Sequence, residues 1–174
     1  MSVSRYFLIL LVILVGYGCQ GVVDRKNYEV IRNVRGKEIK ISNVELFFSY
    51  NSKILIYVDT VDCTTCRVRN LIFWQDLMED YQELDSALNL IYVINPRPEV
   101  EVEVEAILYE LGLKNVWLDR DNDFIKMNPF VPRDKKFHVF LLNKENKIEL
   151  IGSPIGNKKL DKLYRKVIKN LKCI

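Results

Sequence analysis

The sequence predicts an α/β fold, in which a mixed central sheet carries helices on both faces. Short apolar runs typical of strands alternate with longer segments whose apolar residues recur every three or four positions. The last two strand-like runs flank a polar turn and precede a final helical segment, so we expect parallel pairing first and an antiparallel hairpin at the end. A length of 174 residues is enough for one such domain.

The sequence of the first half of the domain predicts a strand, a second strand, a helix and a third strand, in that order. Residues 37–41 alternate polar and apolar side chains, which favours a strand with one exposed face. Residues 54–58 are continuously apolar, as in a strand buried on both faces. From Val68 to Leu88 the apolar residues follow helical spacing. Residues 90–94 predict another buried strand, which Asn-Pro-Arg-Pro ends.

The segment 100–112 fits both a strand and a helix. Its first six residues alternate, but the helical set of apolar residues extends further and Gly112 stands where a helix commonly ends. We therefore predict a helix, which leaves Val102 exposed. Residues 115–119 predict a short strand.

The last third predicts a loop, a hairpin and a helix. Residues 120–136 read as a loop with one helical turn around Phe124. Residues 137–142 and 147–151 flank the turn Asn-Lys-Glu-Asn, which indicates a β-hairpin. The apolar residues from 160 to 171 lie on one helical face.

Composition excludes several classes of protein. Hydrophobic residues make up 49% and charged residues 28%, which is typical of a globular domain and not of a disordered or multi-pass membrane chain. The 26 basic and 23 acidic residues give a net charge of +3, with no long run of like charges. Nucleic acid is therefore not an expected partner.

The N-terminal segment has the layout of a secretory signal: Arg5, an apolar run over residues 6–15, and small residues before Cys19. The run is shorter than the roughly 20 residues of a membrane-spanning helix. With Cys19 directly after glycine, it resembles a bacterial lipoprotein signal. This resemblance implies a signal peptide over 1–18 and a lipid on Cys19, with 19–35 as a tether.

The expected location follows from that signal. We expect the protein in the bacterial cell envelope, anchored by its lipid and facing the periplasm. The residue after Cys19 is Gln20 and not the aspartate associated with inner-membrane retention, which favours the outer membrane. An uncleaved signal anchor and an ordinary secretory signal remain alternatives.

Cys63-Thr-Thr-Cys66 lies between a predicted strand and the start of the long helix. Unpaired N–H groups at a helix start stabilise a thiolate, so Cys63 is the expected exposed nucleophile. Cys66, one turn further and expected to be more shielded, would resolve the mixed disulfide. Arg67 and Arg69 are interpreted as solvated. Half of a zinc site and a purely structural disulfide are the alternatives.

At these residues the chain resembles the thioredoxin superfamily, in particular the membrane-anchored periplasmic thioredoxin-like proteins related to TlpA. The resemblance runs from about Gly36 to Leu171, and we assign residues 36–174 to this domain. It implies a thioredoxin-like three-layer sandwich, thiol-disulfide exchange with thiols and disulfides of envelope proteins, and no bound cofactor. It also implies Cys63 as nucleophile and Cys66 as resolving residue.

The sequence departs from that family at three places. Asp62 replaces the usual tryptophan before the first cysteine, and its carboxylate disfavours a neighbouring thiolate by like-charge repulsion. Two threonines replace the more usual Gly-Pro pair. The family's cis-proline should fall near Phe137 or His138, and neither is proline.

His138 is the only histidine, and the resemblance places it near the Cys-x-x-Cys. Its plainest interpretation is a packed, hydrogen-bonded side chain. An alternative is a Cu(I) site of Cys63, Cys66 and His138, because thiolates and imidazole suit a soft ion.

The auxiliary candidates are acidic. Asp59, Asp62 and Asp119 are candidate proton acceptors near the cysteines, although aspartates in loops are commonly turn formers. Cys173 has no assigned role. The sequence thus indicates a thiol-disulfide oxidoreductase, with a non-catalytic thioredoxin-like scaffold and a copper-handling protein as alternatives.

Overall fold

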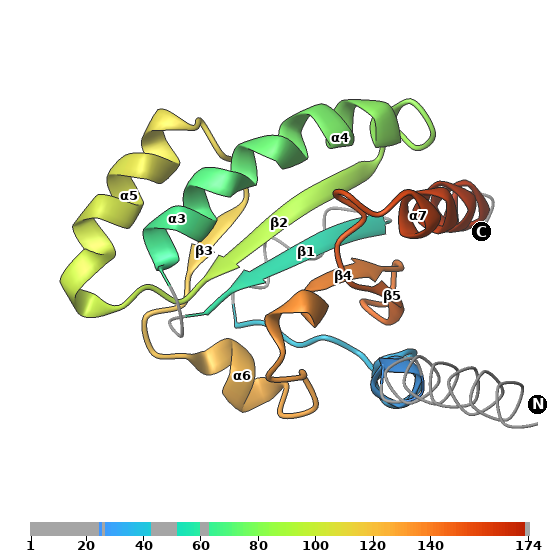
Figure 1. Cartoon of the computed structure of the whole chain (residues 1–174), viewed down its shortest axis with the longest axis horizontal. Helices are drawn as coiled ribbons and strands as arrows, with labels where there is room; N and C mark the ends of the chain where they lie inside the picture. The colour runs from blue at the N-terminus through green and yellow to red at the C-terminus, as the bar shows by residue number, and fades with distance from the viewer. Residues whose placement is uncertain (1–24, 26, 43–51, 60–62, 173–174) are drawn as a thin grey trace, which may run out of the picture. The chain divides into compact units, whose positions relative to one another are not determined.

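The chain divides into two compact units, Met1–Val34 and Arg35–Ile174. The computed structural model describes residues 25, 27–42, 52–59 and 63–172 (Figure 1). The predicted signal segment, Cys19, Asp62 and Cys173 lie outside the described residues. Residues 27–34 are helical, which the aperiodic sequence of the predicted tether did not indicate.

The second unit is built on a five-stranded mixed sheet (Figure 1). The first three strands are parallel and joined by helices, while the last two run antiparallel, as the sequence predicts. In spatial order the strands are β3 (Val116–Leu118), β2 (Leu88–Ile94), β1 (Ser52–Val58), β4 (Val139–Leu142) and β5 (Ile148–Ile151). All seven residues of β1 are buried, which matches its continuous apolar sequence.

The helices follow the predicted order, with one interruption. They are α3 (Thr64–Arg69), the 3₁₀ turn η1 (Asn70–Ile72), α4 (Phe73–Gln82), η2 (Pro98–Val100), α5 (Glu101–Glu110), α6 (Asp123–Met127), η3 (Lys135–Phe137) and α7 (Lys158–Leu171). Val102 on α5 is 81% exposed and Gly112 just after it has φ +60°, both as predicted for a helix.

The long helix ends earlier than predicted, because Leu88 begins β2 instead of continuing the helical face. Asp85 holds the intervening turn: its carboxylate accepts the N–H of Ala87 at 3.0 Å and the hydroxyl of Ser52 at 2.6 Å. These bonds join the turn to the start of β1, a tertiary contact that helical periodicity does not report.

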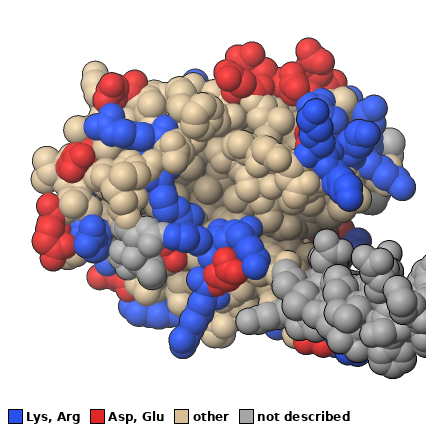
Figure 2. All heavy atoms as spheres, in the orientation of Figure 1, with Lys and Arg blue, Asp and Glu red and all other residues tan. Residues whose placement is uncertain are grey.

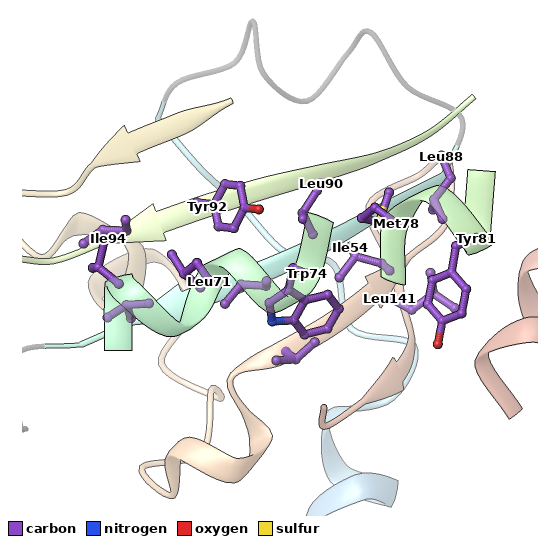
Figure 3. Close-up of a cluster of buried hydrophobic side chains, with 14 of the residues drawn as sticks. Ile54, Leu71, Trp74, Met78, Tyr81, Leu88, Leu90, Tyr92, Ile94 and Leu141 are labelled. Carbon is purple, nitrogen blue, oxygen red and sulfur yellow. The ribbon is translucent and has the colours of Figure 1, made fainter. Parts of the chain in front are cut away.

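Helices cover both faces of the sheet. On one face, side chains of α3, α4, α5 and α7 pack on alternate residues of β1, β2 and β4. Figure 3 shows part of this core, where Trp74 and Met78 of α4 point at Ile54 and Leu90. On the other face, Phe124 of α6 packs on Tyr57 of β1 with ring centroids 4.7 Å apart.

The strand predicted over residues 37–41 does not form; it is replaced by a single bridge between Glu38 and Lys147. The reason is a side chain. The amide of Asn128 accepts the N–H of Lys40 at 2.8 Å and donates to the Lys40 carbonyl at 2.6 Å, which occupies the groups that a strand would use. No helix among the described residues is both long and apolar enough to cross a lipid bilayer.

Candidate functional site

Polar residues follow all three parallel strands at one edge of the sheet. Asp59 follows β1, Asn95 follows β2 and Asp119 follows β3. The backbone pairs them: the N–H of Asn95 donates to Val58 O, and that of Asp119 to Ile94 O, each at 2.8 Å. Ligand and active sites of open α/β sheets lie at this edge.

The two cysteines of the motif form a disulfide at the start of α3, with Cα atoms 5.3 Å apart. Cys63 is the N-cap, and its sulfur accepts the N–H of Cys66 at 3.3 Å and lies 3.4 Å from the Thr65 hydroxyl. The predicted placement of the motif at a helix start is confirmed. Both donors, together with the helix dipole, would stabilise negative charge on the Cys63 sulfur after reduction.

The predicted shielding of Cys66 is wrong, since both cysteines are exposed. The buried face of the helix is set instead by Thr64, Val68 and Leu71, which are spaced four and three apart and at most 4% exposed. Cys66 lies off that face. Either sulfur is therefore accessible to a partner, and the hydrogen bonds to Cys63 distinguish the two.

Arg67 connects the helix to the end of β1. Its guanidinium donates to Asp59 Oδ1 at 3.0 Å and to the carbonyl of Tyr57 at 3.3 Å, while its backbone N–H bonds Cys63 O at 3.1 Å. The interpretation of Arg67 as a solvated residue is therefore wrong. That interpretation does fit Arg69, whose side chain is largely exposed. Its guanidinium forms a long ion pair, 3.8 Å, with the exposed carboxylate of Glu110.

His138 lies beside Asp59. No metal-binding group of three side chains among the described residues joins it to the cysteines. His138 is 2% exposed, its Nε2 is 2.8 Å from Pro132 O, and its ring centroid is 5.0 Å from that of Tyr57. Nδ1 is 3.7 Å from Asp59 Oδ2, and no described residue forms a hydrogen bond to it. Burial lowers the pKa of His138, against the opposing effects of the Pro132 carbonyl and Asp59.

These contacts assign the proton positions. The pKa below the ordinary value indicates a neutral imidazole, and Nε2 carries the proton because it faces a carbonyl. Asp59 then lies between a cationic guanidinium and a neutral ring. Of the two predicted proton acceptors that the structure describes, Asp59 and Asp119, Asp59 is the one bonded to the helix of the cysteines.

Asp119 has a structural role. It is 2% exposed, and its two carboxylate oxygens accept the N–H groups of Asp123 and Phe124 at 2.8 and 2.9 Å, which caps α6. Burial raises the pKa of Asp119, and these bonds oppose the rise. Burial, followed by the negative charges of Asp59 and Asp119, also raises the pKa of Tyr57.

The described residues contain no group of three or more His, Cys, Asp and Glu side chains that could hold a metal ion. The Cu(I) alternative with Cys63, Cys66 and His138 thus gains no support. They also contain no cis peptide bond: Phe137 ends η3 and His138 follows with φ −87°. The loop that carries the cis-proline in the family has a different conformation here.

Of the comparisons with known proteins, the one with solved structures bears on the fold. No protein-family model matches the chain, and no curated protein matches it. Among solved structures, a thioredoxin-like protein in its oxidised form is 14% identical, with a TM-score of 0.52 over 79% of this chain and 93% of that one. A protein of Chlorobium tepidum described as a putative thiol:disulfide interchange protein DsbE is 13% identical, with a TM-score of 0.51 over 77% and 95%.

The chain has a thioredoxin-like fold. This confirms the predicted fold class, a mixed sheet with helices on both faces. At these identities the likeness concerns the fold alone, so the chemistry has to be argued from the residues of the site.

Proposed function

We propose that this protein is a thiol-disulfide oxidoreductase that acts through Cys63 and Cys66. The observation that carries the proposal is the exposed disulfide at the start of a helix on a thioredoxin-like sheet. A disulfide that only stabilises a fold is commonly buried, whereas one that exchanges with partners needs an accessible sulfur. The donors at the Cys63 sulfur support Cys63 as the nucleophile.

The reaction needs no cofactor. In the reduced protein the Cys63 thiolate attacks a disulfide of the partner, which forms a mixed disulfide and releases one partner thiolate. The Cys66 thiolate then attacks the Cys63 sulfur and releases the second partner thiolate. Two electrons pass to the partner, and the Cys63–Cys66 disulfide is restored. The reverse sequence oxidises a partner dithiol.

The test is reduction of insulin disulfides by the full chain under a dithiol reductant. We expect Cys63→Ser to abolish catalysis, whereas Cys173→Ser, which removes a cysteine outside the pair, keeps it. Reduced Cys66→Ser, freed of the dithiol before insulin is added, should accumulate a mixed disulfide with the partner, because the variant lacks the resolving thiol. Equal rates for the parent and Cys63→Ser would overturn the proposal and favour the non-catalytic scaffold.

The reduction potential of the pair gives a second measurement. We expect a value above about −300 mV, since structural disulfides of secreted proteins lie below it. A lower value would indicate a stabilising disulfide and contradict the proposed exchange.

We also propose export and lipid anchoring through Cys19, with the domain facing the periplasm and exchanging with thiols of envelope proteins. The basic residue, apolar run and cysteine of the N-terminal sequence support this. Mass spectrometry of the protein purified from membranes should find residues 1–18 removed and a lipid on Cys19. Cys19→Ala should leave the membrane fraction; an unchanged distribution would contradict the lipid anchor.

A further inference from the structure

The polar face of α7 carries a lysine stripe, which we define as Lys158, Lys159, Lys162, Lys166, Lys169 and Lys172, the last at the C-cap. All six are exposed. Lys158, Lys162 and Lys166 follow one another at four-residue intervals, so they share one side of the helix. Figure 2 shows the basic side chains gathered over α7 at the right of the molecule.

The acidic side chain of α7 is engaged by neighbouring groups. Asp161 is the only acidic residue of the helix, and it accepts the Tyr81 hydroxyl at 2.9 Å and the Arg165 guanidinium at 3.1 Å. Arg165 also reaches Asp80 on α4 at 2.8 Å. The charge of Asp161 is thus paired within the fold, and every other charged residue of α7 is basic.

Like charges four residues apart destabilise a helix. The stripe repeats this arrangement at Lys158, Lys162 and Lys166, although the whole chain has a net charge of only +3. The apolar side of α7 is already used, since Tyr164 and Ile168 are fully buried in the core. The helix cannot insert into a bilayer without unfolding the domain, so its exposed side is suited to electrostatic contact with a flat anionic surface.

We propose that the lysine stripe of α7 docks the domain on anionic phospholipid headgroups. This rests on the membrane location proposed above. Each lysine near an anionic lipid surface is attracted to it by about 1 kcal/mol, so the stripe would hold an anchored domain in one orientation. In Figure 1 α7 lies at the right and the Cys63 end of α3 at the left, so docking through α7 leaves the disulfide open to partners.

The test uses the protein purified from membranes and reconstituted on phosphatidylcholine vesicles with or without phosphatidylglycerol. Lysines are acylated with an amine reagent, and the rate at each position is measured by mass spectrometry. Lys114 and Lys126, which are exposed and lie outside α7, are the internal controls. Flotation with phosphatidylcholine vesicles tests the anchor separately, and insulin reduction tests the redox function.

Phosphatidylglycerol should slow acylation of Lys158, Lys162 and Lys166 by about five-fold or more, the factor that corresponds to the attraction of one lysine to an anionic surface. Lys114 and Lys126 should not change. The protection should vanish near 1 M salt, where the Debye length falls to about 3 Å. A flotation signal that drops with Lys158, Lys162 and Lys166 changed to glutamine would support the same conclusion.

Equal acylation on both kinds of vesicle would overturn the proposal. So would protection on phosphatidylcholine alone, because it would not depend on lipid charge. Protection by soluble polyglutamate, with none on phosphatidylglycerol, would identify an acidic protein segment as the partner in place of the membrane.

Discussion

Replacing Arg67 tests whether the link between β1 and the helix of the cysteines holds the site together. Arg67→Met keeps most of the volume of the side chain but removes the guanidinium that contacts Asp59 and the Tyr57 carbonyl. The Asp59 carboxylate then faces the neutral ring of His138, with Oδ2 and Nδ1 3.7 Å apart. A carboxylate left without its cation in a buried position is costly.

The magnitude follows from burial. Removing one partner of a fully buried pair costs about 3–5 kcal/mol. The side chains of Arg67 and Asp59 are 24% and 12% exposed, so water recovers part of this cost. We therefore expect Arg67→Met to lower the free energy of unfolding by about 2–3 kcal/mol. Urea unfolding with the disulfide intact measures it, from the midpoint at constant slope.

Arg69→Met is the matched control, because it changes the same residue type two positions away on the same helix. Arg69 is 56% exposed and its partner Glu110 is 71% exposed. A surface pair of this kind contributes about 0–1 kcal/mol. If Arg67→Met costs no more than Arg69→Met, the reasoning is refuted.

The double variant Asp59→Asn with Arg67→Met sharpens the test. Asparagine carries no charge, so the penalty for stranding the carboxylate disappears. The double variant should cost less than the two single variants added together, by about 1 kcal/mol or more. Strict additivity would show that the two side chains act independently.

Three further changes test other parts of the structure. Burial lowers the pKa of His138 below 6.5, so between the two values the unfolded chain binds a proton that the folded chain does not. The free energy of unfolding should therefore fall as the pH drops below about 6.5 and become constant below the lowered pKa. Urea unfolding at several pH values should show a weaker pH dependence for His138→Gln than for the parent. The same pH dependence in both proteins would contradict this reasoning. Asn128→Ala removes the side-chain bonds to Lys40 and Phe124 at a fully buried position and should cost about 2–4 kcal/mol, where a loss below about 1 would show that those bonds are replaced. Gly152→Ala places a side chain at φ +102° and should lower the unfolding temperature through backbone strain of about 1–3 kcal/mol, whereas an unchanged melting temperature would mean that the backbone relaxes.

The strands and the start of α3 could be predicted from the sequence, because both are written in local patterns. The continuous apolar run of β1 reports burial on two faces, and the Cys-x-x-Cys follows it at a helix start. The strand expected near residue 38 failed for a nonlocal reason: Asn128, far away in sequence, takes both backbone groups of Lys40. No pattern within residues 37–41 contains that information.

The site was predicted less completely than the fold. Spacing identified Cys63 and Cys66 but not that both are exposed, because the rotation of the helix about its axis is fixed by the burial of Thr64 and Val68. Arg67 resembles any other surface arginine of an amphipathic helix. Its partner Asp59 lies at the end of a different element, so the pair appears only once the strand and the helix are placed together.

The loop before β4 lacks the cis peptide bond that the resemblance to the thioredoxin superfamily predicts. In the family that this chain resembles, a cis-proline there helps to bind the partner's backbone. Here the N–H of His138 donates to Lys135 O at 3.1 Å, and its carbonyl accepts the N–H of Tyr57 at 2.9 Å. Asp134 likewise accepts the N–H groups of Lys136 and Phe137.

The N–H groups of residues 136–138 and the carbonyl of His138 are thus bonded within the domain, and a partner cannot pair with these groups as an added strand unless η3 opens. Strand addition supplies affinity through main-chain bonds, so its loss at this loop shifts recognition to the exposed sulfurs and to surrounding side chains. A protein that binds its partners weakly gains most from being held where they are concentrated, since tethering raises effective concentration without any new contact. An anchored domain with a basic face against the membrane satisfies that requirement.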